Sequence, residues 1–159
     1  MKQTELIFSI NLPIKATIMN TSKHTIVYAE DDLDDLFIVK QAFEKHDHIN
    51  VIHAPDGKKA LLTLEEMWQD NYLPCLVILD INMPIMNGKE TLQAIRNHPH
   101  LNRLSVVLFT TSNSPADIAF ARNLNAELVT KPIEYSDLEH IARAFVEQCN
   151  FEINKLSMN

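Results

Sequence analysis

The fold of this chain is indicated most directly by the stretch Cys75-Leu76-Val77-Ile78-Leu79-Asp80. Residues 75–79 are all apolar, and the segment Val106-Val107-Leu108-Phe109 repeats this pattern further along the chain. A strand that is apolar at every position, rather than at every second one, is buried on both of its faces. Such strands are typical of a parallel sheet that helices cover on both sides. Both segments therefore predict strands of an α/β domain.

The segments around these two runs alternate between strand and helix patterns. Three further short apolar segments predict strands at residues 26–29, 51–54 and 127–130. Helical patterns follow at residues 33–43, at 58–69 and up to about residue 97, with two more after residue 114 and after residue 136. Five strands that alternate with five helices predict one doubly wound α/β domain.

Three helix starts carry capping signals. Asn87 and Glu90 have the spacing of a capping box, in which each side chain binds the backbone of the other residue. Ser114 is expected to cap the next helix, with a proline at its first position. Ser136 and Glu139 again have the capping-box spacing and predict the start of the last helix.

Composition excludes several classes of protein. The chain has 159 residues, and its 21 acidic against 14 basic side chains give a net charge of −7. This charge argues against nucleic acid or an anionic membrane as the main partner, because both attract basic surfaces. The two cysteines, Cys75 and Cys149, lie far apart in no metal-ligand spacing, which argues against a disulfide scaffold or a zinc site and favours a reducing cytoplasm.

The domain is expected to cover residues 23–150. Residues 1–22 contain a short apolar stretch that Asn11 and Pro13 interrupt, so we interpret them as an N-terminal extension of unknown role rather than a membrane span. Residues 151–159 are expected to form a C-terminal tail that is too short for an effector domain.

The strand ends carry the chemistry. Glu30 and Asp31 follow the first predicted strand, Asp80 the third, Thr110 the fourth and Lys131 the fifth. Ligands of doubly wound sheets bind at this edge, so we expect these side chains to converge. Carboxylates brought together repel one another, and oxygen ligands without His or Cys favour Mg²⁺. A lysine and a hydroxyl beside them suit the binding of phosphoryl oxygens.

Residues 30–35 form the strongest acidic run of the chain, with Leu33 as its one interruption. Asp34 and Asp35 are interpreted as helix-start acids that complement the helix macrodipole or face solvent.

These motifs resemble the response-regulator receiver domains of bacterial two-component signalling, of the chemotaxis-regulator type. The matching pieces occur in the family's order over residues 24–150: Glu30-Asp31, Asp80-x-x-Met83-Pro84-x-x-x-Gly88, Thr110 and Lys131-Pro132. The segment from Asn82 to Glu90 is similar to that of stand-alone regulators associated with cyanobacterial phytochromes. The resemblance implies a flavodoxin-like fold with strand order 2-1-3-4-5.

The resemblance also implies roles for single residues. Asp80 would accept a phosphoryl group from the phosphohistidine of a sensor histidine kinase or phosphotransfer protein. Glu30, Asp31, Asp80 and the backbone carbonyl of Asn82 would hold Mg²⁺. Thr110 would move towards the phosphoryl group and Lys131 would pair with it.

Two further features follow from the family pattern. The Lys131–Pro132 bond is expected to be cis. Leu128 stands where the family usually has an aromatic residue, so the output is expected to travel through the loop after Thr110 instead.

Three functions are compatible with these residues. The first is a cytoplasmic phosphoacceptor, not an enzyme, which signals by phosphorylation-dependent binding to an unidentified protein or by phosphorelay, with a homodimer left open. The second is a Mg²⁺-dependent phosphatase of the haloacid-dehalogenase type. Such enzymes place the nucleophile after their first strand and an acid two residues later, where this chain has Asp80 after the third strand and Asn82. The third is a degenerate receiver that only binds proteins.

Overall fold

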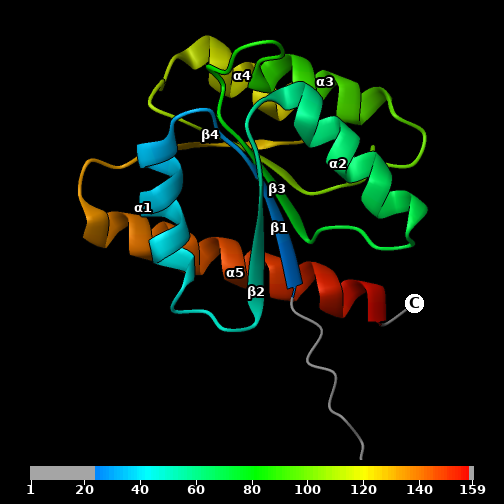
Figure 1. Ribbon diagram of the computed structural model, residues 1–159. Helices are drawn as coiled ribbons and strands as arrows, with labels where there is room; N and C mark the ends of the chain where they lie inside the picture. Colours follow the sequence, from blue (N-terminus) through cyan, green and yellow to red (C-terminus); the bar gives the residue numbers. More distant parts are fainter. Residues whose placement is uncertain (1–23, 158–159) are drawn as a thin grey trace, which may run out of the picture.

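The computed structural model describes residues 24–157 as a sheet of five strands between two layers of helices (Figure 1). The N-terminal extension expected for residues 1–22 lies outside the described residues. Strands and helices alternate along the whole described chain. The strands are β1 (His24–Ala29), β2 (Ile49–Ala54), β3 (Leu76–Leu79), β4 (Val106–Thr110) and β5 (Glu127–Thr130).

All neighbouring strands are parallel, in the order β2-β1-β3-β4-β5, which confirms the predicted fold. Ala29 pairs with Ala54 on one side and with Leu79 on the other, so these strands end level with one another. Strands β3 and β4 are buried at every position, as their sequences predict. The carboxyl ends of β1, β2 and β3 point to the top of Figure 1.

The helices cover both faces of the sheet. Helices α1 and α5 pack on one face around Tyr28 and Ile78, whereas α2, α3 and α4 pack on the other around Val27 and Leu79. Both helix layers therefore bury apolar side chains from the same central strands. The helices are α1 (Leu33–Phe43), α2 (Gly57–Gln69), α3 (Gly88–Asn97), α4 (Pro115–Asn123) and α5 (Tyr135–Ser157).

Two of the predicted helix starts are confirmed. Asn87 and Glu90 form both hydrogen bonds of the capping box at α3. The Ser114 side chain accepts a hydrogen bond from the backbone N–H of Asp117, and Pro115 begins α4.

The start predicted for the last helix is wrong. Helix α5 begins at Tyr135, so Ser136 lies inside the helix, and the carboxylate of Glu139 pairs with Lys45, just after α1. The carbonyl of Glu134 accepts hydrogen bonds from the backbone N–H groups of residues 137 and 138, which starts the helix one residue before the predicted cap. The helix also continues past Asn150 to Ser157.

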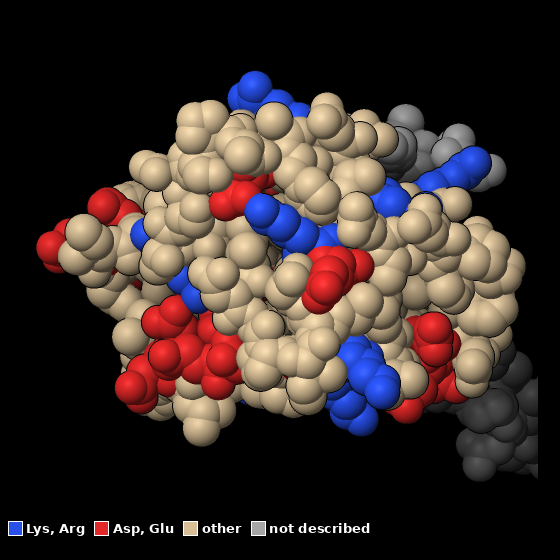
Figure 2. All heavy atoms as spheres, turned by 90° about the horizontal axis from the view of Figure 1, so that it is seen from above, with Lys and Arg blue, Asp and Glu red and all other residues tan. Residues whose placement is uncertain are grey.

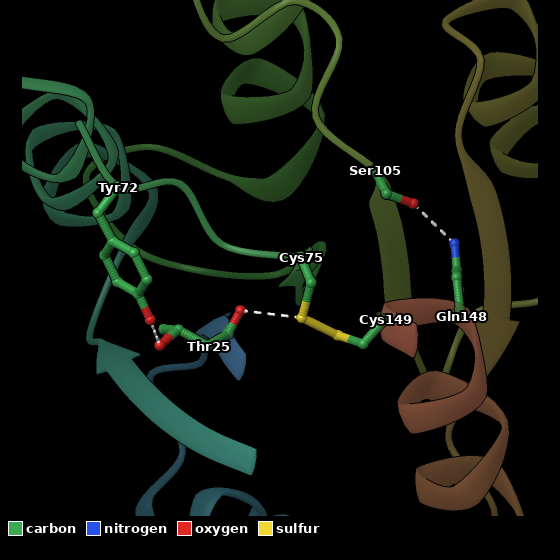
Figure 3. Close-up of a disulfide and its surroundings, with 6 residues drawn as sticks. All are labelled: Thr25, Tyr72, Cys75, Ser105, Gln148 and Cys149. Atoms are coloured by element: carbon green, nitrogen blue, oxygen red, sulfur yellow. Dashed lines mark hydrogen bonds between the residues drawn. A yellow bond between two sulfur atoms is a disulfide. The ribbon is translucent and has the colours of Figure 1, made fainter. Parts of the chain in front are cut away.

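The structure contains a disulfide between Cys75 and Cys149, which corrects the expectation from the cysteine count (Figure 3). The two residues are 74 positions apart in sequence, yet their Cα atoms lie 4.9 Å apart because α5 packs beside the start of β3. The Sγ of Cys75 also lies 3.2 Å from the carbonyl oxygen of Thr25. Because the two cysteines are paired, they no longer support a reducing compartment.

None of the helices between residues 24 and 157 combines the length and the apolar character needed to cross a membrane.

Candidate functional site

The carboxyl edge of the sheet brings together the side chains that the sequence singled out. Glu30 follows β1, Asp80 follows β3, Thr110 ends β4 and Lys131 follows β5. Figure 2 looks down on this edge and shows a compact group of acidic side chains at its lower left. The convergence predicted from the strand ends is therefore observed.

Three carboxylates form the acidic part of the site. Oxygen atoms of Glu30, Asp31 and Asp80 all lie within 4.8 Å of one another. Glu30 and Asp80 are only 1% and 5% exposed, whereas Asp31 is exposed. The Oδ2 atom of Asp80 accepts a hydrogen bond of 2.7 Å from the backbone N–H of Asn82. The cluster is therefore buried at Glu30 and Asp80 and open to solvent at Asp31.

Close packing beneath the site fixes the backbone at Asp80. The N–H of Gly88 donates to the carbonyl of Ile81 at 3.0 Å. A Cβ atom on Gly88 would lie 2.1 Å from the carbonyl oxygen of Asp80, which only a glycine avoids. The start of α3 can therefore pack directly against the end of β3.

The ammonium of Lys131 lies among the carboxylates. Its Nζ atom is 2.6 Å from Glu30 Oε2, and it is 3.0 Å from Asp80 Oδ1. Burial of the ammonium opposes its charge, but the hydrogen bonds to Asp35 and Glu30 and the nearby negative charges outweigh burial and raise the pKa of Lys131. The lysine therefore stays positively charged beside Asp80.

Asp35 belongs to the site, which corrects its interpretation as a solvated helix-start acid. Its Oδ2 atom lies 2.8 Å from Lys131 Nζ. Asp34, the next acid in the run, is exposed and forms no ion pair with any described residue. Asp32 caps α1 by accepting hydrogen bonds from the backbone N–H groups of residues 34 and 35.

Tyr28 holds Glu30 and was not found from the sequence. Its hydroxyl donates to Glu30 Oε2 at 2.6 Å, while the backbone N–H of Asp32 donates to Oε1 at 3.1 Å. Burial, followed by the charge of Glu30, raises the pKa of Tyr28. The Nε2 atom of His53 lies 2.7 Å from the carbonyl oxygen of Glu30. Both the side-chain carboxylate and the backbone carbonyl of Glu30 therefore have close polar partners.

Thr110 is fully buried and begins a connected loop. Its Oγ1 accepts a hydrogen bond of 3.3 Å from the backbone N–H of Ser112. The Ser112 hydroxyl donates to Asp117 Oδ2 at 2.9 Å, and Lys89 forms an ion pair with the same carboxylate. Contacts therefore connect Thr110 to the starts of α4 and α3.

The bond before Pro132 differs from the family expectation. The described residues contain no cis peptide bond, so Lys131–Pro132 is trans and the expected cis bond is wrong. The trans form is also the one that X–Pro bonds prefer. Leu128 is half-buried and packs against the core on the side of α2, α3 and α4.

Comparison with known proteins identifies the family. Residues 26–143 match the family model of the response regulator receiver domain. The chain belongs to this family. Receiver domains are parts of the response regulators of two-component systems, which interact with histidine kinases or phosphotransfer proteins.

Stand-alone receiver proteins are among the relatives of this receiver domain. The response regulator Rcp1 of Synechocystis sp. is 30% identical over 71% of this chain and 80% of its own length. The phosphorylated cyanobacterial phytochrome response regulator RcpA has a TM-score of 0.70 and 29% identity, over 78% of this chain and 91% of RcpA. The Mn²⁺-bound form of Rcp1 has a TM-score of 0.65 and 28% identity, over 76% and 90% of the two chains.

Proposed function

We propose that this receiver domain accepts a phosphoryl group on Asp80 from the phosphohistidine of a sensor histidine kinase or phosphotransfer protein. It then signals by phosphorylation-dependent protein binding or by passing the group on. One observation carries the proposal: the Lys131 ammonium lies 3.0 Å from Asp80 Oδ1, at the edge of the sheet that also holds Glu30 and Asp31.

The transfer needs little more than positioning and charge. A carboxylate oxygen of Asp80 forms a bond to phosphorus as the bond between phosphorus and the histidine nitrogen breaks, and the nitrogen keeps the electron pair. The phosphoryl group carries roughly −1.5 to −2 charges. Lys131 offsets part of this charge from beside Asp80, while the Asn82 N–H orients the Asp80 side chain.

The donor set fits a magnesium ion. Three carboxylates that lie this close repel one another, and they offer only the oxygen ligands that Mg²⁺ prefers. Glu30, Asp31 and Asp80 would hold the ion, together with the Asn82 carbonyl. Bound Mg²⁺ supplies positive charge beside the phosphoryl oxygens. The Mn²⁺-bound form of Rcp1 supports a divalent ion in this family.

The readout runs through Thr110 and the loop after it. The Thr110 hydroxyl turns towards the phosphoryl group and gives up the hydrogen bond from the Ser112 N–H. This moves the loop that Asp117 and Lys89 tie to α4 and α3. Strand β5 carries Leu128 and no aromatic side chain, so the loop is the moving part.

An exposed apolar surface beside Lys131 supports docking of a phosphodonor protein. Leu33 and Phe37, one turn apart on α1, are 70% and 62% exposed, and Ile133 is 99% exposed. A pocket of about 300 Å³ lies between α1 and the start of α5, and its lining includes Ile38, Lys131 and Ile133. Exposed apolar patches of this kind mark protein interfaces.

Phosphorylation from a small donor tests the proposal without knowledge of the kinase. The chain is incubated with acetyl phosphate and Mg²⁺, and its intact mass is measured. We expect one phosphate adduct that Asp80→Asn and removal of Mg²⁺ abolish and that Asp34→Asn retains. An adduct that persists in Asp80→Asn would refute Asp80 as the acceptor, and sustained turnover of a generic phosphomonoester would instead favour a phosphatase.

A further inference from the structure

Asp35 is a carboxylate that the proposed transfer does not use. Its Oδ2 atom lies 2.8 Å from the Nζ atom of Lys131, which is also 2.6 Å from Glu30 and 3.0 Å from Asp80. A lysine ammonium has three N–H donors. The ammonium donates hydrogen bonds to Glu30 and Asp35 and forms an ion pair with Asp80, so one cation serves three carboxylates.

A phosphoryl group on Asp80 changes this arrangement. It brings new oxygen acceptors and roughly −1.5 to −2 charges to the position that Lys131 faces. The phosphoryl oxygens then compete with Glu30 and Asp35 for the Lys131 ammonium. The choice depends on how well each carboxylate can be solvated once the ammonium turns away.

Exposure distinguishes the two partners other than Asp80. The Glu30 side chain is 2% exposed, so water cannot replace the ammonium at this buried carboxylate, and its loss there is costly. The Asp35 side chain is 43% exposed, and water can replace the ammonium there. Half-exposed ion pairs contribute little. Asp35 is therefore the partner that Lys131 releases at the lowest cost.

We infer that Asp35 is a positioning residue that holds Lys131 while Asp80 is free and opposes its transfer to the phosphoryl group. The inference rests on the proposed function. Asp35 touches none of the reacting atoms. It competes with the phosphoryl oxygens for the ammonium, and its negative charge repels them, so the carboxylate limits phosphorylation of Asp80.

The consequence has a definite sign. Asp35→Asn keeps the shape of the side chain and removes its charge, so Lys131 becomes free to meet the phosphoryl group and the repulsion falls. We expect phosphorylation to become roughly two- to fivefold faster, the range that a half-exposed ion pair provides. A role of Asp35 in merely keeping Lys131 in place predicts the opposite, slower phosphorylation.

Initial rates of adduct formation with acetyl phosphate and Mg²⁺, followed by intact mass, test the inference on the full chain. Asp34→Asn is the matched control, because it removes the same charge from the neighbouring exposed residue on α1. Asp35→Glu restores the carboxylate. Each chain is measured at about 0.1 M and about 1 M salt, where charges are screened beyond about 10 and 3 Å.

We expect Asp35→Asn to be faster than the wild-type chain at low salt, with the difference reduced at high salt. Asp34→Asn and Asp35→Glu should stay close to the wild-type rate. Equal or slower phosphorylation of Asp35→Asn would overturn the inference and leave the proposed function intact. A wild-type chain that gains no phosphate on Asp80 would overturn both.

Discussion

Glu30 is the residue on which most of the site's contacts meet. Its Oε2 atom accepts hydrogen bonds from the Tyr28 hydroxyl and the Lys131 ammonium, both at 2.6 Å, and Oε1 accepts one from the Asp32 N–H. This carboxylate is buried, so each of these donors replaces water that it lost on folding. The neighbours of Glu30 therefore set both its position and the cost of burying its charge.

We predict that Tyr28→Phe lowers the free energy of unfolding by about 1.5–3 kcal/mol, because it removes a hydrogen bond to a buried charge and little else. Urea unfolding at neutral pH measures the change. Tyr135→Phe is the control: the residue is 42% exposed and its hydroxyl interacts with Glu139 near the surface, so the loss should stay below about 0.5 kcal/mol. Equal losses in the two variants would contradict the role given to the Tyr28 hydroxyl.

Asp31 provides a test of the metal site that does not involve phosphate. A ligand that binds only the folded chain stabilises it by about 2.7 kcal/mol at a hundred times its dissociation constant. We expect Mg²⁺ to raise the melting temperature of the wild-type chain and of Asp34→Asn, but not of Asp31→Asn. The measurement is thermal unfolding over a series of Mg²⁺ concentrations. If Mg²⁺ raised the melting temperature of Asp31→Asn as much as that of the wild-type chain, Asp31 would be excluded as a ligand.

At the scale of the elements, a salt bridge between Lys89 and Asp117 joins the starts of α3 and α4. Hydrogen bonds from Lys89 and Ser112 hold the pKa of Asp117 below its ordinary value. A lowered pKa in the folded chain means that the pair stabilises the fold above the ordinary carboxyl pKa. This stabilisation disappears as the pH falls through the lower, folded pKa.

We predict that Lys89→Gln raises the pKa of Asp117 towards the ordinary value. A carboxyl NMR titration measures this midpoint directly. The variant should unfold more easily than the wild-type chain near pH 7, and the difference should vanish at a pH below both pKa values. Lys58→Gln, at an exposed lysine on α2, is the matched control, and an Asp117 midpoint that Lys89→Gln leaves unchanged would contradict the prediction.

At the scale of the whole molecule, the disulfide joins the start of β3 to α5 (Figure 3). Asp80 follows the opposite end of β3. The bridge closes a loop that contains β3, β4 and β5, and such cross-links stabilise mainly by restricting the unfolded chain. The hydrogen bond from Gln148 Nε2 to Ser105 Oγ, at 2.7 Å, joins α5 to the same region.

We predict that replacing both cysteines, Cys75→Ser with Cys149→Ser, lowers the free energy of unfolding by about 2–4 kcal/mol. Chemical unfolding of the full chain, with and without dithiothreitol, measures the loss. The reductant should destabilise the wild-type chain and leave the double variant unchanged. A wild-type chain that responds to the reductant no more than the double variant would show that the bridge contributes nothing.

The strands and the strand-end residues were predictable because local patterns determine them. Runs such as residues 75–79 are apolar at every position, and parallel strands put the residues that follow them at one edge. The disulfide, the Tyr28 hydroxyl and the contact of Asp35 with Lys131 were missed. The cysteines and the Asp35–Lys131 pair lie 74 and 96 positions apart, and only packing brings them together. Tyr28 and Glu30 are two positions apart, but their contact depends on side-chain conformations that the sequence pattern does not specify.

Chemical trapping of the acyl phosphate tests the central claim most directly. The chain is phosphorylated with acetyl phosphate and Mg²⁺ and reduced with sodium borohydride, which converts a phosphorylated aspartate to homoserine, and its peptides are then sequenced by mass spectrometry. We predict homoserine at position 80 and at no other acidic residue. Homoserine at Asp31 or Asp35, or none at all, would contradict the account.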